Sequence, residues 1–245
     1  MQAACRAAQA VGASILLFVA GCDWHFRSEP LATPVPAEDI EDFSKLYGLH
    51  CAGCHGPNGN LGPAPPLNDP VFLSIVPDTE LERVISDGRK GTLMPAWSRE
   101  KGGPLSDKQV KILATEMRRQ DDWKLLSKAD AEIPEYLAPA GNGDKKTGDE
   151  LFAKVCAGCH GDQGSGGKEI EGKKIGAVRD QAFLSLLSDQ ALRRLIITGR
   201  PDLGMPGYGP LAGRSDSFKP LTSADVSDLV ELLKYWRNAP SKNAR

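Results

Sequence analysis

Two copies of one pentapeptide, C-x-x-C-H, carry the chemistry in this sequence, at residues 51–55 and 156–160. Two thiols at this spacing lie on one turn of a helix, where they can add across the two vinyl groups of a haem. The histidine that follows then faces the iron. The spacing therefore predicts a covalent haem site in each copy. The predicted attachment residues are Cys51, Cys54, Cys156 and Cys159, and the predicted iron ligands are His55 and His160.

Two other sites use the same residue types. A zinc site needs four ligands, and no second C-x-x-C lies near either motif. A redox dithiol of the thioredoxin type belongs to a βαβ pattern, and no such pattern is visible around the motifs. Repetition of the motif with matching surroundings favours haem over both alternatives.

The second iron ligand decides between electron transfer and chemistry on a substrate. Met94 and Met205 each precede a proline, at equivalent positions of the matching stretches 67–97 and 178–208. A thioether ligand favours reduced iron and raises its potential, which suits an electron carrier. We therefore predict Met94 and Met205 as iron ligands. The alternative is that both fill the core, as we predict for Met117 on a helix.

The elements that must position these residues occur twice. Apolar residues at helical spacing lead into each motif, and a later helical pattern in each copy stops at a glycine, Gly88 or Gly199. Arg89 and Arg200 follow these glycines and are candidates to pair with haem propionates, although a solvated arginine near a helix end is equally ordinary. A last amphipathic helix closes each copy.

The 245 residues suffice for about two domains of ordinary size. We predict a first repeat at residues 38–120, a linker rich in Pro, Gly and Asp at 121–145, and a second repeat at 146–240. The second repeat carries extra residues, with three lysines, between its motif and the matching stretch.

Residues 1–21 have the pattern of a bacterial export signal. Arg6 precedes an apolar run that ends at Ala20, too short to span a bilayer. The segment before Cys22 resembles a lipoprotein signal, in which cleavage precedes a lipid-bearing cysteine. We therefore predict lipid on Cys22; the alternative is ordinary cleavage with this cysteine buried or removed. Residues 22–37 contain three prolines and read as an extended tether.

Lipid on Cys22 would attach the mature protein stably to a membrane. Asp23 resembles the signal that keeps some lipoproteins on the inner membrane. Export also fits c-type haem, which bacteria attach outside the cytoplasm. Cys5 leaves with the signal, so no disulfide is predicted. The expected location is the periplasm or the outer face of the inner membrane.

A helix that ends in C-x-x-C-H, a second helix, a Met-Pro loop and a final amphipathic helix resemble the class I cytochrome c family, twice over. The resemblance covers nearly all of residues 38–240. It implies an all-α fold of two tandem cytochrome c domains, each a small helical fold around one covalently bound haem. It also implies that the carbonyl of Pro65 accepts a hydrogen bond from the proximal histidine, a role that Gly176 would take in the second repeat.

The family crosses its first and last helices at a glycine and an aromatic residue. Gly148 and Trp236 match this pattern in the second repeat. The first repeat departs from it, with Phe43 in place of the glycine and Gln120 opposite the tryptophan. Its helix crossing is therefore expected to be wider or shifted.

The leading functional interpretation is a membrane-anchored dihaem cytochrome c of a bacterial respiratory or photosynthetic chain. It would carry single electrons between a redox donor and a redox acceptor, one of them a membrane complex, without enzymatic activity or a small-molecule substrate. One alternative is a fixed cytochrome subunit of a larger membrane oxidoreductase complex. A less favoured alternative is a dihaem enzyme, either a peroxidase or a thiosulfate-oxidising cytochrome, which would need an exchangeable or unusual sixth ligand. The net charge of −2 and the predicted export do not support nucleic-acid binding.

Overall fold

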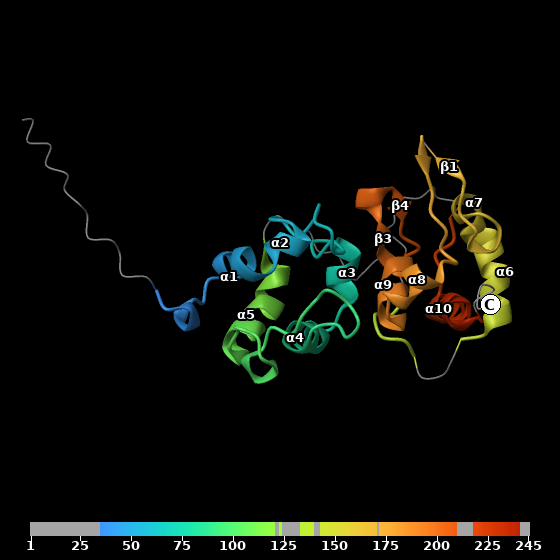
Figure 1. Cartoon of the computed structure of the whole chain (residues 1–245). Helices are drawn as coiled ribbons and strands as arrows, with labels where there is room; N and C mark the ends of the chain where they lie inside the picture. The colour runs from blue at the N-terminus through green and yellow to red at the C-terminus, as the bar shows by residue number, and fades with distance from the viewer. Residues whose placement is uncertain are drawn as a thin grey trace, which may run out of the picture. The chain divides into compact units, whose positions relative to one another are not determined.

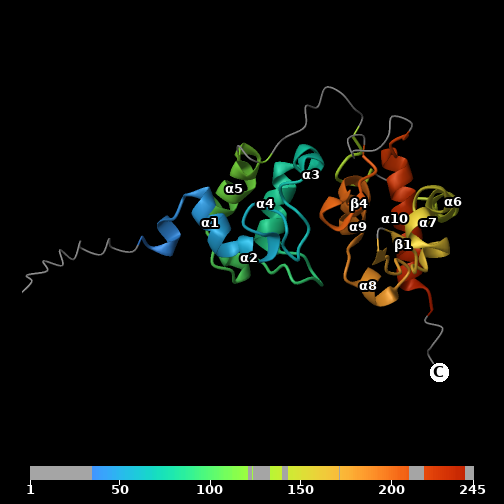
Figure 2. The ribbon, with the colours of Figure 1, turned by 90° about the horizontal axis from the view of Figure 1, so that it is seen from above.

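Helices dominate the regular structure of the chain in the computed structural model (Figures 1 and 2). The structure describes residues 35–120, 123, 133–139, 143–170, 172–209 and 218–240. Both repeats belong to one compact unit, which begins at Pro36. The predicted export signal, the predicted lipid on Cys22 and most of the predicted tether lie outside the described residues.

In the first repeat a 3-10 turn and a helix precede the motif, and a short helix carries its last four residues. Three more helices follow, with one 3-10 turn before the last of them and one after it. In chain order the elements are η1 (Ala37–Asp39), α1 (Phe43–His50), α2 (Ala52–His55), α3 (Pro70–Ile75), α4 (Asp78–Asp87), η2 (Arg99–Lys101), α5 (Asp107–Glu116) and η3 (Met117–Arg119).

The second repeat follows the same helix order and adds short strands. Two antiparallel two-stranded pairings, β1 with β2 and β3 with β4, interrupt the helices. In chain order the elements are α6 (Lys145–Val155), α7 (Ala157–His160), η4 (Asp162–Gly164), β1 (Glu169–Ile170), β2 (Lys173–Lys174), α8 (Gln181–Ser185), α9 (Asp189–Thr198), β3 (Gly199–Arg200), η5 (Pro201–Leu203), β4 (Met205–Pro206) and α10 (Ser223–Asn238).

Side-chain caps explain why equivalent helices begin at equivalent residues. Asp69 accepts a hydrogen bond from the backbone N–H of Phe72 (2.7 Å), and Asp180 accepts one from Phe183 (2.8 Å). Such caps satisfy backbone donors that have no partner inside the helix. The final helices α5 and α10 both begin with a capping box, at Ser106 and Thr222. The two repeats therefore share the capping residues at which equivalent helices begin.

The crossing of α6 and α10 in the second repeat depends on Gly148. A Cβ atom at this position would lie 2.2 Å from the backbone oxygen of Asp228 on α10. The two helices can approach this closely only because residue 148 has no side chain. Beside the crossing, the rings of Phe152 and Trp236 meet edge to face with centroids 5.0 Å apart. The expected pairing of Gly148 and Trp236 is thus present.

The first repeat solves the same packing problem with a tryptophan beyond its last helix. Alignment of the repeats places Gln120 at the position equivalent to Trp236. This expectation is wrong, because Trp123 takes the packing role of that tryptophan. The ring of Trp123 would lie 2.6 Å from a Cβ at Gly59, as the ring of Trp236 would lie 2.9 Å from one at Gly164. α5 ends at Glu116 and passes into the 3-10 turn η3. Alignment of the two repeats with a constant difference in residue number therefore no longer pairs equivalent residues here.

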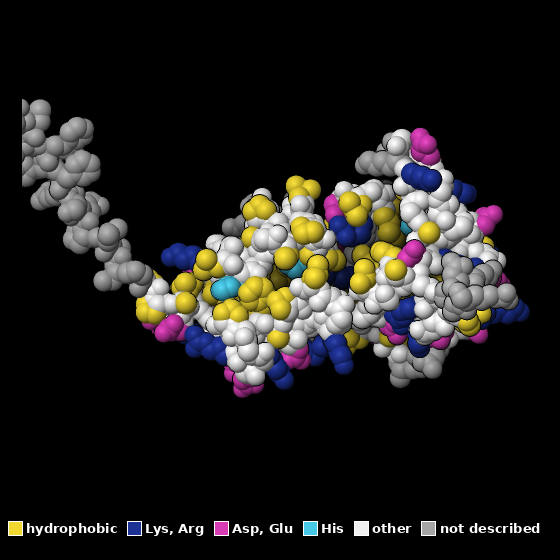
Figure 3. Space-filling model, viewed as in Figure 1, with side chains coloured by type: hydrophobic (Ala, Val, Ile, Leu, Met, Phe, Trp, Pro, Cys, Tyr) yellow, Lys and Arg dark blue, Asp and Glu magenta, His cyan; other side chains and the backbone are white. Residues whose placement is uncertain are grey.

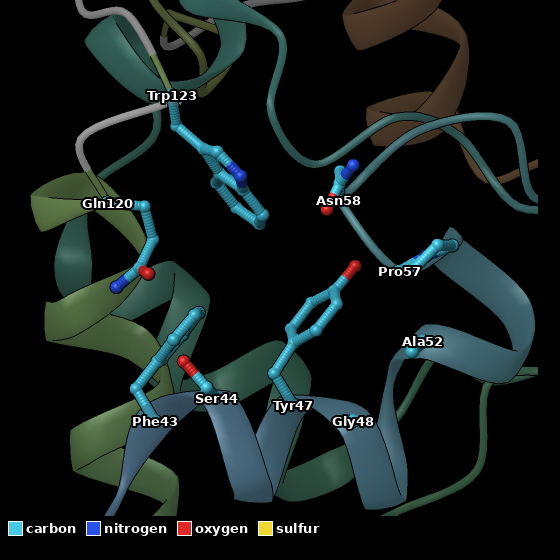
Figure 4. Close-up of a pocket in the computed structure, with 9 residues that line it drawn as sticks. All are labelled: Phe43, Ser44, Tyr47, Gly48, Ala52, Pro57, Asn58, Gln120 and Trp123. Atoms are coloured by element: carbon cyan, nitrogen blue, oxygen red, sulfur yellow. The ribbon is translucent and has the colours of Figure 1, made fainter.

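A hollow of about 360 Å³ follows from the altered crossing (Figure 4). Phe43 occupies the position of Gly148, and α1 and α5 approach each other over far fewer residues than α6 and α10 do. Trp123 instead meets Phe43 and Tyr47 edge to face, with centroids 6.2 and 5.7 Å away. Gln120 faces the hollow, which explains why a polar residue is tolerated there. The expected shift of the crossing is therefore present.

Residues 133–139, inside the predicted linker, contact both repeats. Tyr136 is buried in the hydrophobic core of the first repeat, where its ring lies 6.0 Å from that of Phe72. Its backbone oxygen accepts a hydrogen bond from Gln190 of α9 (2.6 Å), and that of Glu135 accepts one from Arg193 (2.9 Å). This part of the chain is therefore held between the two repeats. Among the described residues, no helix has both the length and the apolar character needed to cross a bilayer.

We predict that Gly148→Ala destabilises the haem-bound protein by about 1–3 kcal/mol, because the added methyl group overpacks the crossing of α6 and α10. Gly48→Ala is the matched control, since Gly48 lies in α1 and a Cβ there meets no atom within 4 Å. The control should be neutral or more stable by up to about 1 kcal/mol. Denaturant unfolding followed by circular dichroism measures both, and equal midpoints for the two variants would contradict the packing argument.

Candidate haem-binding sites

The two C-x-x-C-H motifs adopt nearly the same backbone conformation. Cys51 ends α1 with φ −115° and ψ −38°, and Cys156 ends α6 with φ −112° and ψ −38°. Each cysteine donates its N–H one turn back, to Tyr47 (2.8 Å) or Phe152 (2.9 Å). The helices α2 and α7 then carry the second cysteine and the histidine of each motif. The thiols and the imidazole of each motif therefore share one helical segment, as the spacing predicted.

The Cys51 thiol lacks the property of a reactive redox thiol. Burial and the neighbouring Cys54 together raise its pKa to about 12. A redox-active dithiol requires the opposite shift, which stabilises a thiolate. In the described part of the chain, no three His, Cys, Asp or Glu side chains come together as a metal site. Neither alternative to haem therefore gains support from the geometry of the first motif.

His55 is oriented by the residue that the family resemblance implied. Its Nδ1 lies 3.0 Å from the backbone oxygen of Pro65, which leaves Nε2 to bind iron. Burial lowers the pKa of the imidazole, the bond to Pro65 raises it, and the charges of Arg194 and Arg89 lower it. A neutral imidazole is the form that binds a metal.

His160 lacks the equivalent hydrogen bond. Its Nδ1 is buried and has no partner among the described residues, and burial lowers its pKa. The expected role of the Gly176 carbonyl is therefore not fulfilled in this structure. The proximal histidines of the two repeats thus differ in their hydrogen bonding, although their motifs share one backbone conformation.

The Met-Pro loops are held against the ends of α4 and α9 by glycine. A Cβ at Gly88 would lie 2.5 Å from the carbonyl carbon of Pro95, and one at Gly199 would lie 2.5 Å from the oxygen of Met205. Both glycines have positive φ, 69° and 70°. The N–H of Arg89 donates to the oxygen of Met94 (3.0 Å), and β3 pairs Arg200 with Met205 on β4. Both methionines are partly buried in equivalent loops, and their ligation of iron remains a prediction.

The two predicted propionate-binding arginines differ in charge compensation. Arg200 donates two hydrogen bonds to Asp202, at 2.9 and 2.6 Å, and this pairing lowers the pKa of Asp202. Arg89 forms no salt bridge in the described part of the chain and donates to the hydroxyl of Tyr136 (3.3 Å). Arg200 is therefore paired directly with a carboxylate, whereas the charge of Arg89 interacts with that of Glu80 without a salt bridge.

Several apolar side chains that are close in the sequence to residues of the first site are exposed. Leu49, Leu61 and Leu93 are 66%, 83% and 99% exposed. Leu49 precedes the motif and Leu93 precedes Met94. Figure 3 shows histidine atoms surrounded by hydrophobic side chains on one face of the molecule. Exposed apolar side chains in the segments that carry the predicted ligands fit a site for an apolar macrocycle such as haem.

Sequence reasoning missed a pair of tyrosines beside the motifs. The buried hydroxyl of Tyr47 donates to the oxygen of Gly56, the residue after His55 (2.9 Å), and burial raises the pKa of this tyrosine. In the second repeat Phe152 replaces Tyr47, and the hydroxyl of Tyr208 instead donates to the oxygen of Val155. Aligned aromatic positions could have suggested the packing, but not these hydrogen bonds.

Comparisons with known proteins show the family to which the chain belongs. The model of a protein family described as cytochrome c oxidase, cbb3-type, subunit III matches residues 38–115 and 143–217. One relative, named Cbb3-type cytochrome c oxidase subunit FixP, from Azorhizobium caulinodans, is 29% identical over 195 residues, which are 72% of this chain and 59% of the relative. The chain therefore spans less than two thirds of that relative. The expected tandem c-type cytochrome fold is confirmed by the two matched segments and the helical structure.

We predict that Tyr47→Phe destabilises the protein by about 0.5–1.5 kcal/mol, because it removes one buried hydrogen bond to the carbonyl of Gly56, which keeps only the N–H of Gly59 as a donor among the described residues. Tyr235→Phe is the control, since Tyr235 is half exposed and lies away from the motifs on α10. Thermal unfolding of the haem-bound variants compares them. The role assigned to the hydroxyl is wrong if Tyr47→Phe unfolds at the same temperature as the control.

Proposed function

We propose that this chain, which belongs to the family of cbb3-type cytochrome c oxidase subunit III, carries single electrons as a haem-bearing subunit of a membrane oxidase complex. The leading interpretation of the sequence is a membrane-anchored carrier that is not a fixed subunit of a complex. The family and the name of the relative support the alternative, a fixed cytochrome subunit. Both share the same chemistry and differ in the permanence of the partner.

The observation that carries this proposal is the double C-x-x-C-H motif with an equivalent Met-Pro loop in each repeat. We propose two covalently attached haems, one in each repeat. When bound, each haem supplies an iron that takes up and releases one electron. The protein groups proposed to hold the two haems are Cys51, Cys54, His55, Pro65, Arg89 and Met94 in the first repeat, and Cys156, Cys159, His160, Met205 and Arg200 in the second.

Each protein group has a separate task. The cysteines hold the macrocycle, and the bond from His55 to Pro65 fixes the orientation of the imidazole. A methionine sulfur at the sixth position leaves no place for an exchangeable ligand. This arrangement favours electron transfer over the dihaem enzyme alternative, in which a substrate must reach the iron.

The partners follow from the same proposal. One redox protein would supply electrons and another group of the complex would accept them. Lipid on Cys22 would keep the protein at the outer face of the inner membrane, on the periplasmic side. Neither nucleic acid nor a small-molecule substrate has a place in this scheme.

Purification in a mild detergent tests the partner. We expect the full chain, tagged at its C-terminus, to co-elute with the other subunits of an oxidase and to carry two haems that remain bound after denaturation. A chain that elutes alone with both haems would favour the free carrier. Loss of colour to acidified organic solvent would contradict covalent attachment altogether.

Redox titration tests the iron ligands. We predict two separate one-electron waves, because only the proximal histidine of the first repeat has a hydrogen-bonded Nδ1. Met94→His should lower one wave and Met205→His the other, each by a sizeable part of the ~0.8 V that axial ligands span. A single unsplit wave would contradict the asymmetry, and ready binding of carbon monoxide by the native protein would contradict methionine ligation.

A further inference from the structure

Arg194 belongs to the second repeat but lies against the first. It is carried on α9, and only 6% of its surface is exposed. Its guanidinium carbon lies 3.5 Å from the centre of the Phe72 ring on α3, and its Nη2 donates to the backbone oxygen of Pro66. Pro66 directly follows Pro65, whose carbonyl binds His55. A guanidinium of one repeat therefore reaches the histidine loop of the other.

The buried charge of Arg194 has no carboxylate partner in the described part of the chain. The charge of Asp69 raises the pKa of Arg194, but no salt bridge joins the two side chains. Burial lowers the pKa of Arg194, which is about 10 with all neighbouring groups included. Arg89 lies nearby, since it donates to the hydroxyl of Tyr136, whose ring lies 6.0 Å from the Phe72 ring that Arg194 covers. Buried cations are normally paired with anions, so a carboxylate bound directly to Arg194 would supply a missing partner.

The equivalent arginine of the first repeat behaves differently. Arg83 occupies the position of Arg194 in the matching stretch 67–97, and its side chain is 52% exposed. It forms a salt bridge with Glu80 at 2.8 Å. The second repeat likewise neutralises Arg200 through Asp202. Among these four arginines, only Arg194 is buried and without a salt bridge in the described part of the chain.

We propose that Arg194 and Arg89 together bind a propionate carboxylate of the haem in the first repeat, so that the second repeat supplies a haem-binding residue to the first. This inference depends on the proposed haem in the first repeat. Both arginines act electrostatically on His55, which places them near the proposed iron ligand. A propionate is an anion with two oxygens, and guanidinium groups bind carboxylates through paired N–H donors.

A bond between Arg194 and the propionate would make the reduction potential of the first haem depend on the second repeat. Oxidation adds a positive charge at the iron, so a nearby cation disfavours the oxidised state. A propionate neutralised by Arg194 also stabilises the oxidised iron less than a free propionate does. Removal of Arg194 should therefore lower the potential of the first haem and leave that of the second unchanged.

The experiment compares Arg194→Gln, Arg194→Lys and the control Arg83→Gln in the full-length, haem-bound protein. Arg83→Gln removes the same charge from the equivalent surface position. The wave that moves in Met94→His identifies the first haem. We expect Arg194→Gln to change the ratio of oxidised to reduced first haem about tenfold at a fixed potential, equivalent to ~59 mV for one electron. Arg194→Lys should retain most of the native potential, and Arg83→Gln should match the wild type.

Infrared spectra separate a bound propionate from a distant charge effect. In oxidised-minus-reduced spectra of protein with ¹³C-labelled haem propionates, the carboxylate bands should shift in Arg194→Gln and not in Arg83→Gln. Unchanged bands overturn the proposal even if the potential falls, as does a first wave that matches the control. If Arg194→Gln does not fold, Arg89→Gln must shift the same bands, and its failure to do so also overturns the proposal.

Failure of the proposed function is distinguishable from failure of this inference. A wild-type protein without haem on Cys51 and Cys54 contradicts the proposed function. If the wild-type protein carries both haems but Arg194→Gln changes neither the first wave nor the carboxylate bands, only the inference is contradicted.

Discussion

The direction of each motif histidine is the constraint on which the rest of the structure depends. An imidazole binds iron in a defined orientation when its backbone is held, and a hydrogen bond to its other ring nitrogen, observed at His55, fixes the ring further. The backbone is fixed by continuity of α1 into α2 and of α6 into α7, through the N–H bonds of Cys51 and Cys156. Those helices are fixed in turn by the aromatic residues that pack beside them, Trp123 in the first repeat and Trp236 in the second. The loops with Met94 and Met205 are then set by the ends of α4 and α9, so a short chain of contacts joins every proposed iron ligand to the core.

The two repeats meet this constraint by different packing, which shows where sequence reasoning succeeds and fails. The motifs, the helix starts and the Met-Pro loops could be predicted because each depends on residues close together in the sequence, such as the caps at Asp69 and Asp180. The role of Trp123 could not be predicted by alignment at a constant offset, because α5 passes into a 3-10 turn before this residue. The missing hydrogen bond of His160 depends on how the backbone of the longer loop between residues 164 and 176 folds, and no residue type in that loop encodes it.

Arginine positions illustrate a further limit of the repeat. Arg83 and Arg194 occupy equivalent positions on α4 and α9, and the sequence offers no reason to treat them differently. One lies at the surface in a pair with Glu80, a contact that contributes little to stability. The other is buried against Phe72, where desolvation of its charge is costly unless an anion is nearby. The difference arises only because the second repeat packs on the first, and a comparison of isolated repeats therefore misses it.

The contacts between the repeats also bear on how the proposed haems communicate. Tyr136 is buried in the core of the first repeat, and its backbone is bound by Gln190 of the second. Val71 of α3 lies in turn in the hydrophobic core of the second repeat. Side chains shared in this way leave little room for one repeat to move without disturbing the core of the other. The separation of the two haem sites is then a property of these buried contacts and not of linker length. A fixed separation suits electrons that pass through both sites in sequence, because the route does not wait for a diffusive encounter between the domains.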